Sequence, residues 1–263
     1  MMKYYILLFL QTLTLSVLAQ DVFQLAPPML KYNSIFFTNE TTVEIKFAQS
    51  ETTVHYTLNN SEPTLQDSIY TKPILIKNNF TTVKAKAFGK QFLPSYTVTV
   101  TFIKDGFTVQ SVESTLPNVK YPGNGANTLI DNNGGINQLG SNTWMGFNCD
   151  TVDIVMNLEK EQTINKVLFD FLQSESSWIF IPEKIIVRWY DSASRSFKNF
   201  GTENFIAEKE TSGSLCNFKI ITTTSKIKTN KISITLIPVK NMPAWHQAKG
   251  EHAWMFIDEI KLY

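Results

Sequence analysis

Apolar and polar residues alternate along most of the chain in short runs, and clusters of Asn, Gly, Pro, Ser and Asp separate these runs. In residues 81–88, for example, Val83, Ala85 and Ala87 fall on one face of a strand, and the two lysines between them fall on the other. Helical periodicity is nearly absent. Short alternating runs with turn residues between them are typical of sandwiches and barrels, so the pattern predicts an all-β protein.

The alternating runs form two groups, one within residues 41–102 and one within residues 152–263. The segment 103–113, which contains Asp-Gly, is expected to join them, and residues 119–142 are so rich in Gly and Asn that we expect irregular structure there. The expected strands are TTVEIKF, TVHYTL, KPILI, TTVKAKAF and YTVTVTF in the first group and VDIVMNL, INKVLFDFL, KIIVRWY, FKIITTT, KISITLI and WMFIDEIKLY in the second.

The N-terminus is typical of an export signal rather than of folded structure. A short positive start is followed by the apolar run 4–18 and by the small residue Ala19, as at a signal-peptidase site. The run is too short to favour a retained membrane span, and no later segment is long and apolar enough. We therefore expect residues 1–19 to be removed and the protein to be secreted, either extracellular, at the cell surface or in a bacterial periplasm, without stable membrane insertion.

Charge and arginine content narrow the class of partner. The chain has 24 basic and 23 acidic residues, for a formal net charge of +1, and its only arginines are Arg188 and Arg195. Such a chain lacks the basic surface of a nucleic-acid-binding protein. It also lacks the polybasic segment that would hold it on anionic lipid. Neutral partners such as glycans are more compatible with this composition.

The chain has two cysteines, Cys149 and Cys216. In an oxidising compartment an even pair can form one disulfide. Two buried free thiols are the alternative, and the sequence does not decide between them.

The first half contains a series of segments in the order of a known module: His55–Thr64, Ser68–Tyr70, Lys72–Ile74, Thr82–Phe88 and Pro94–Ser95. With these segments it resembles the fibronectin type III-associated, chitobiase C-terminal-like module, which is an immunoglobulin-like β-sandwich without catalytic residues of its own. The resemblance covers about 80 residues and implies a sandwich over residues 21–104. One departure is Asn59-Asn60, where the family usually has Asp-Gly.

The second half, residues 114–263, contains a second ordered series of segments: Lys120–Gly123, Leu129–Asp131, Trp144–Phe147, Ser177–Phe180, Pro182, Pro243–His246 and Ala253–Ile260. With these segments it resembles a discoidin-type (coagulation factor type C) jelly roll, and more narrowly the one in the C-terminal tail of secreted bacterial β-hexosaminidases. A cysteine, Cys149, stands where a glycine is usual.

The second resemblance implies a metal site. Discoidin-type modules commonly hold one structural calcium between an early acidic loop and an acid near the last strand, and Asp131 and Glu259 stand at those positions. Calcium takes six to eight oxygen ligands, many of them backbone carbonyls, and the segment 127–135 can bend to present them. We expect one structural Ca²⁺ and no other cofactor. The alternative is that Asp131 forms an Asx turn and Glu259 is a solvated strand residue.

Sugar binding requires an exposed aromatic face and a few fixed polar groups. Trp178 and Trp245 lie in segments that read as loops, and His246 follows Trp245 directly. These three residues are the expected ligand-binding set, and the remaining three tryptophans are expected in the core. The alternative is that the two loops only pack on the end of the barrel.

Catalysis is not expected. Asp258-Glu259 imitates the acid pair of hexosaminidases, but that pair belongs to a (β/α)8 barrel of roughly 250 residues, for which the chain has no space. Adjacent side chains of a strand also point to opposite faces, so the two acids are not expected to flank a sugar together. The sequence contains no Gly-x-Ser-x-Gly elbow, no P-loop and no HExxH motif.

The sequence therefore predicts an all-β protein: a signal peptide (1–19), an N-terminal immunoglobulin-like β-sandwich (21–104), a junction (105–113) and a discoidin-type β-sandwich or jelly roll (114–263). The expected function is non-catalytic attachment to polymeric or cell-surface glycans, including those that contain N-acetylglucosamine. Two alternatives remain: a structural or adhesive protein-binding module, and an accessory or remnant of a family-20 β-N-acetylhexosaminidase.

Overall fold

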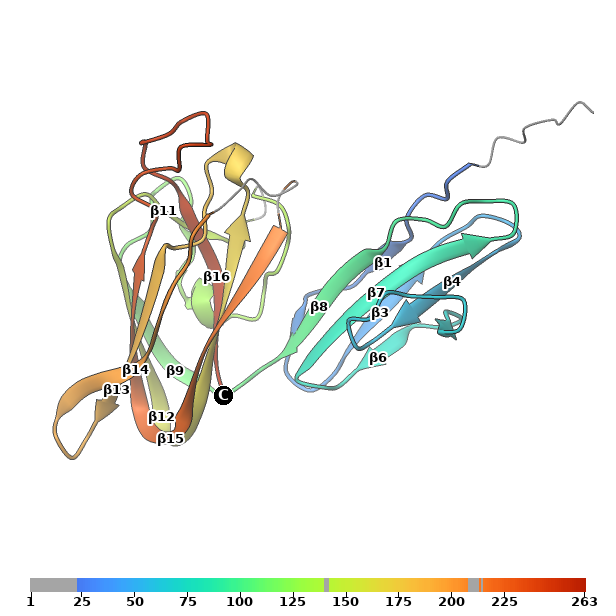
Figure 1. Ribbon diagram of the computed structural model, residues 1–263. Coiled ribbons are helices and arrows are strands. Elements are labelled where there is room, and N and C mark those ends of the chain that lie inside the picture. Colours follow the sequence, from blue (N-terminus) through green and yellow to red (C-terminus); the bar gives the residue numbers. More distant parts are fainter. Residues whose placement is uncertain (1–22, 140–141, 208–212, 214) are drawn as a thin grey trace, which may run out of the picture.

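The fold was obtained as a computed structural model, which describes residues 23–263 apart from 140–141, 208–212 and 214. Within these residues the regular structure is almost entirely β, and the two helices are single 3-10 turns, η1 (Asn127–Ile130) and η2 (Glu175–Ser177) (Figure 1). The predicted all-β class is confirmed. No helix of the described chain is long and apolar enough to span a bilayer. The expected signal peptide lies outside the described residues.

The N-terminal module, residues 29–104, is a sandwich of two sheets. One sheet has the order β1-β3-β6 and the other the order β2-β8-β7-β4-β5. The core between them is formed by the alternating positions that the sequence predicts, such as Val83, Ala85 and Ala87, each 0% exposed. The strands are β1 (Met29–Lys31), β2 (Phe36–Phe37), β3 (Thr41–Lys46), β4 (Thr52–Thr57), β5 (Ser68–Ile69), β6 (Ile74–Ile76), β7 (Phe80–Gly89) and β8 (Val98–Lys104).

The C-terminal module, residues 109–262, is built on strands linked in the order β11-β16-β12-β15-β13-β14, with β9 also paired to β12. Its aliphatic and aromatic core is formed by the inward-facing residues of these strands, as expected for a jelly roll. The strands are β9 (Val109–Ser114), β10 (Gly123–Ala126), β11 (Met145–Phe147), β12 (Val152–Gln173), β13 (Lys184–Asp191), β14 (Ser196–Asn204), β15 (Leu215–Ile237) and β16 (Met255–Leu262).

Two long strands differ from the sequence-based prediction. Residues 152–158 and 164–172 were expected as separate strands, but they form one continuous strand, β12. Its partner β15 likewise joins two expected strands. The pairing between β12 and β15 has a register shift between Asn157 and Gln162. The exposed polar residues 159–161 lie there, and such residues are also typical of a turn between two strands. A bulge lets each strand bend and serve both layers of the module.

The two cysteines are free thiols. Cys149 packs against the main core of the C-terminal module, whereas Cys216 packs against a separate cluster around Trp144 and Leu172. They therefore belong to different parts of the module, and the structure favours the alternative of two unbonded thiols.

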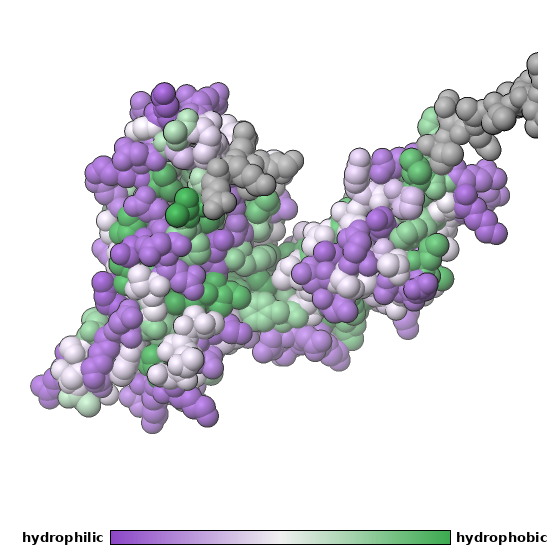
Figure 2. Space-filling view, in the orientation of Figure 1, coloured by the Kyte–Doolittle hydropathy of each residue, from purple (hydrophilic) through white to green (hydrophobic). Residues whose placement is uncertain are grey.

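The two modules contact each other at one end, and Figure 2 shows apolar residues gathered where they meet. Leu168 of β12 is 0% exposed and belongs to the core cluster of the N-terminal module. The chain also ends at this junction (Figure 1): the Tyr263 ring packs at 5.6 Å from that of Phe80, and its hydroxyl donates to the Lys104 carbonyl at 2.7 Å.

Candidate functional site

The loops at one end of the C-terminal module bring together Trp178, Trp245 and His246, which we call the aromatic rim. Trp178 ends η2, and Trp245 and His246 lie in the connection between β15 and β16. The His246 ring meets Trp178 edge-to-face at 6.4 Å and Trp245 at 5.7 Å between ring centroids. The three residues expected to bind a ligand are thus neighbours, although 67 positions separate the first from the second in sequence.

His246 is the buried member of the aromatic rim. It is 5% exposed, and its Nε2 lies 2.8 Å from the Glu175 carbonyl oxygen. Because a carbonyl only accepts, Nε2 carries the proton, and Nδ1 then accepts from the Ala248 backbone N–H at 3.1 Å. Both ring nitrogens are used inside the protein, so His246 fixes the relative position of the two loops.

The two rim tryptophans are accessible. Trp178 is 39% exposed and Trp245 is 37% exposed, whereas Trp144 is 2% exposed and Trp254 packs against the same cluster as Trp144. The Trp245 indole N–H donates to the Ala207 carbonyl at 2.9 Å, and its ring packs at 6.0 Å from that of Phe180, so the ring is held in place by the protein. A hollow of about 350 Å³ lies beside Trp245 and His246, lined also by Ser176 and Gln247.

Trp178 has an uncommon backbone conformation. Its φ is 64° and its ψ is 21°, in the left-handed region that bulky residues rarely occupy. The conformation is fixed by neighbours: the Trp178 N–H donates to the Glu175 carbonyl at 2.8 Å, and the Trp178 carbonyl accepts from the Trp254 N–H at 2.9 Å. Strain of this kind persists where the surroundings over-determine it, and it concentrates at binding sites.

A second candidate site is the carboxylate cluster, Asp131, Asp258 and Glu259. Asp131 follows η1, and the other two lie in β16. One carboxylate oxygen from each lies within 4.8 Å of the others. The expected pair of Asp131 and Glu259 is therefore close in space, and Asp258 joins it.

The participation of Asp258 corrects the expectation that adjacent strand residues point to opposite faces. Between β12 and β16, Phe169 pairs with Ile260 and Phe171 pairs with Ile257, so two steps on one strand oppose three on the other. This bulge sets Asp258 and Glu259 on the same side, while Ile257 and Ile260 both enter the core. The signal was present in the sequence, because the gap of three between these two isoleucines breaks the alternation.

The backbone of residues 132–135, the cluster loop, covers the two buried acids. The Asn132 N–H donates to Glu259, and the Gly135 N–H donates to Asp258 Oδ2 at 2.8 Å. At Gly134 an added Cβ would lie 1.4 Å from that same oxygen, so only glycine allows this approach. Asp131 Oδ1 accepts from the Asn133 N–H at 3.0 Å, which is the Asx turn considered from the sequence.

Burial dominates the electrostatics of the cluster. Asp258 and Glu259 are both 0% exposed, so the alternative of a solvated Glu259 is wrong. Burial raises the pKa of Glu259 to about 7, against the opposing effect of Lys261, whose Nζ lies 2.9 Å from Oε2. Burial, and then the charge of Asp170, raise the pKa of Asp258 well above its usual value.

Asp170 of β12 completes this acidic region. Its side chain is 0% exposed, and burial followed by repulsion from Glu259 raises its pKa well above the usual value. Neither of its oxygens has a hydrogen-bond partner among the described residues, nor does Oδ1 of Asp258. Asp170 was not identified from the sequence, because it alternates with the core residues Phe169 and Phe171 and so falls on the opposite face of the strand.

These residues fit a hard divalent cation. Calcium prefers carboxylate oxygens, and Asp131, Asp258 and Glu259 would supply them. Unpartnered buried carboxylates are costly unless a proton or a cation neutralises them. When bound, calcium would supply positive charge and tie the cluster loop to β16, which is a structural rather than a chemical contribution.

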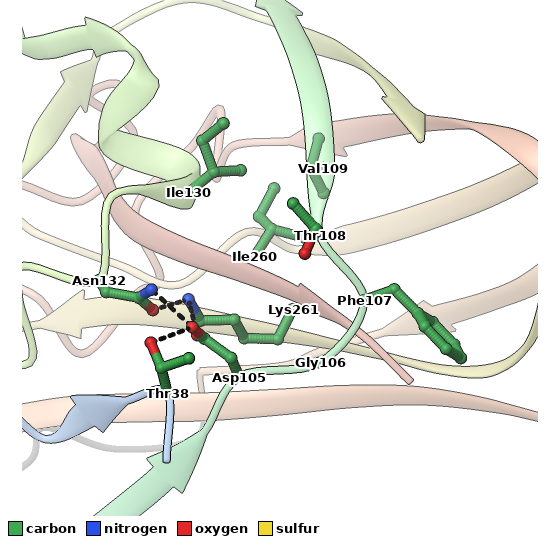
Figure 3. A pocket seen from close by; sticks show the side chains of 10 residues that line it. All are labelled: Thr38, Asp105, Gly106, Phe107, Thr108, Val109, Ile130, Asn132, Ile260 and Lys261. Carbon is green, nitrogen blue, oxygen red and sulfur yellow. Dashed lines mark hydrogen bonds and ion pairs between the residues drawn. The ribbon is translucent and has the colours of Figure 1, made fainter. Parts of the chain in front are cut away.

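Lys261 connects the carboxylate cluster to the junction between the modules. Figure 3 shows its ammonium group beside Asp105 and Asn132, at the edge of a small cavity of about 220 Å³. Nζ lies 3.0 Å from Asp105 Oδ1, and Asp105 Oδ2 accepts from the Asn132 amide at 2.7 Å and from the Thr38 hydroxyl at 3.0 Å.

The solved structures that the chain resembles include a fucosidase and several carbohydrate-binding modules, and the three described here are at most 18% identical to it. A fucosidase of family GH29 from Ruminococcus gnavus in complex with fucose is 14% identical over 58% of this chain, with a TM-score of 0.38, and the chain spans only 25% of its length. The family 32 carbohydrate-binding module of Streptococcus pneumoniae EndoD is 18% identical over 59% of this chain and 94% of its own, with a TM-score of 0.39. A chitosan-binding module from a chitosanase/glucanase of Paenibacillus sp. IK-5 is 13% identical over 58% and 93%, with a TM-score of 0.36.

Comparison with sequences gives one assignment. No curated protein matches the chain. Residues 43–102, from β3 into β8, match the protein family described as Fn3 associated. The resemblance of the first half to this family is confirmed, and the N-terminal module carries an Fn3-associated segment.

Proposed function

We propose that the protein is a secreted, non-catalytic carbohydrate-binding protein that attaches to polymeric or cell-surface glycans, including those that contain N-acetylglucosamine. The C-terminal module is the part that recognises the glycan, through Trp178 and Trp245. The N-terminal module acts as a spacer.

The observation that carries this proposal is the pair of accessible indole rings at the aromatic rim. Both residues are more than a third exposed, and a hollow of about 350 Å³ lies beside Trp245. Sugar rings present apolar C–H faces that pack on aromatic rings, while polar groups at the edge fix hydroxyls. The buried His246 holds the two loops together, so the rings are positioned before a ligand arrives.

The placement of the acids supports a non-catalytic role. Asp258 and Glu259 converge, but both are 0% exposed beneath the cluster loop, where a glycosidic bond has no access. The accessible aromatic rings lie at the loops of η2 and of the β15–β16 connection instead. A glycosidase requires its two carboxyl groups to flank the scissile bond.

Glycan-array binding of the full chain, with calcium and with EGTA, tests the proposal. Trp178→Ala and Trp245→Ala should each weaken binding of the best ligand by about fivefold to tenfold, because an aromatic stacking contact is worth about 1–1.4 kcal/mol. Phe197→Ala, at an exposed aromatic residue on the β13–β14 hairpin, is the matched control and should bind normally.

Two results would contradict the proposal. An array without sugar preference, together with binding to a protein partner, favours the adhesive alternative. Turnover of a chromogenic N-acetylglucosaminide that is lost in Glu259→Gln favours the hexosaminidase alternative.

We further propose that the carboxylate cluster holds one structural Ca²⁺ through Asp131, Asp258 and Glu259. The support is the convergence of the three carboxylates, together with the unpartnered buried oxygens of Asp258 and Asp170. A cation at about 100 times its Kd stabilises the folded state by about 2.7 kcal/mol, which corresponds to roughly 5–10 °C for a protein of this size. Calcium should therefore raise the melting temperature by that amount relative to EGTA.

Asp131→Ala should abolish the calcium-dependent shift in melting temperature. Asp150→Ala, at an acid whose side chain is 67% exposed, should keep it. A melting temperature that is the same in calcium and in EGTA for the unmodified chain would rule the metal site out.

A further inference from the structure

The carboxylate cluster and the contact between the modules share the same short segment of chain. The cluster loop, residues 132–135, donates backbone N–H groups to Glu259 and Asp258 on one side. On its other side the same loop is in contact with the N-terminal module, through Asn132 and Gly135. One loop therefore lies between the candidate cation site and the other module.

Ser34 and Ile35 of the N-terminal module hold this loop directly. The Ser34 hydroxyl donates to the Asn132 carbonyl at 3.0 Å. The Ile35 side chain packs so closely on Gly135 that an added Cβ there would lie 2.0 Å from Ile35 Cδ1. Asn132 and Gly135 both have positive φ, 61° and 71°, so the loop needs such contacts to keep its shape.

Lys261 provides a second, charged connection (Figure 3). Its ammonium group lies 2.9 Å from Glu259 Oε2 in the carboxylate cluster and 3.0 Å from Asp105 Oδ1 at the junction, and it also donates to the Asn132 side-chain oxygen. The aromatic ring of Phe36, from the N-terminal module, lies 5.2 Å from Nζ. Lys261 is 6% exposed, so its charge is shared among these few partners.

The distribution of this charge matters for a cation. An ammonium group held only by Glu259 would repel a divalent ion from the cluster, whereas Asp105 draws the ammonium toward the junction and adds negative charge nearby. Within the described residues, Ser34 and Asp105 form no hydrogen bond or ion pair with the carboxylate cluster itself. They act through Asn132 and Lys261.

We propose that the cation site is a composite of both modules, in which Ser34 and Asp105 are positioning residues for the carboxylate cluster. By reciprocity, a cation in the cluster fixes the N-terminal module against the C-terminal module. This inference rests on the calcium site proposed above, and it adds that the site reaches full affinity only while the modules are in contact.

Calcium titration of the full chain by isothermal calorimetry tests this, after removal of metal with EGTA. Ser34→Ala and Asp105→Asn should each weaken calcium binding by about threefold or more, because each removes a contact that orders Asn132 or Lys261. The matched controls are Thr52→Ala, which removes a hydroxyl bonded to the Gln49 carbonyl, and Glu44→Gln, which removes an ion pair with Lys46. Both controls should bind calcium like the unmodified chain.

Small-angle scattering of the same proteins provides the reciprocal measurement. The unmodified chain should become more extended in EGTA than in calcium, and Asp131→Asn should remain extended in both. Asp105 is partly exposed, so Asp105→Asn keeps the test decisive if Ser34→Ala fails to fold.

The possible failures are distinguishable. Absence of calcium binding by the unmodified chain overturns both the metal site and the composite site. Calcium binding that is lost in Asp131→Asn but unchanged in Ser34→Ala and Asp105→Asn overturns the composite site alone, as does scattering that is identical in calcium and in EGTA.

Discussion

Asp170 is the residue whose burial has the clearest energetic consequence. It lies on the outward face of β12 between Leu168 and Leu172, and that face is covered, so all three side chains are 0% exposed. The two leucines gain from burial, whereas a carboxylate loses its hydration. With its oxygens unpartnered among the described residues, Asp170 destabilises the cation-free fold whenever it is ionised.

The direction of the pKa shift predicts how Asp170→Asn changes stability in EGTA. Because burial raises the pKa of Asp170, the folded state binds more protons than the unfolded state between the two pKa values. The free energy of unfolding of the unmodified chain therefore falls through this group as pH rises, by about 1.4 kcal/mol per pH unit. Asp170→Asn lacks this loss, so its free energy of unfolding should increase relative to that of the unmodified chain from pH 5 to pH 8.

Urea unfolding at several pH values, with metal removed, measures the difference. Asp150→Asn is the control, because this acid is exposed and its replacement should leave the pH dependence of the unmodified chain intact. Parallel curves for the unmodified chain and Asp170→Asn would contradict the burial argument.

At the scale of elements, strands with regular alternation could be predicted from the sequence. Bulges and continuous bent strands could be predicted only in part. The gap between Ile257 and Ile260 marks the bulge in β16, but its meaning depends on β12 pairing beside it. The polar residues 159–161 read as a turn, whereas they form an exposed part of a continuous strand. Turns and bulges both expose polar residues, so sequence alone does not separate them.

In the candidate sites, too, some features could be predicted from the sequence and others depend on tertiary contacts. The exposure of Trp178 and Trp245 followed from their loop contexts, and the proximity of Asp131 to Glu259 followed from the family resemblance. The burial of His246 did not, because its partners lie in another loop and in its own turn. Asp170 was missed because it lies on the face of β12 opposite Phe169 and Phe171, and that face is buried only through tertiary contacts.

At the scale of the whole molecule, the modules are coupled through more than the Lys261 network. Leu168 is buried in the core cluster of the N-terminal module, and the last residue of the chain, Tyr263, packs against the first residue of β7. The Lys166 ammonium lies 5.1 Å from the Phe80 ring and 5.8 Å from the Tyr263 ring. A contact of mixed apolar and charged groups should make the two modules unfold together.

Tyr263→Ala should separate the unfolding of the modules. The change removes the ring contact with Phe80, the cation–π contact with Lys166 and the hydrogen bond to the Lys104 carbonyl, at a cost of about 2–3 kcal/mol. Differential scanning calorimetry should show one transition for the unmodified chain, and for Tyr263→Ala a second transition at a lower temperature.

Tyr263→Phe, which loses only the hydrogen bond, should lower stability by about 1 kcal/mol and keep one transition. Tyr96→Ala, at a ring that is 71% exposed, should change neither. A single transition at an unchanged midpoint in Tyr263→Ala would mean that Tyr263 does not couple the modules, and that Leu168, the Lys261 network and the cluster loop are sufficient to join them.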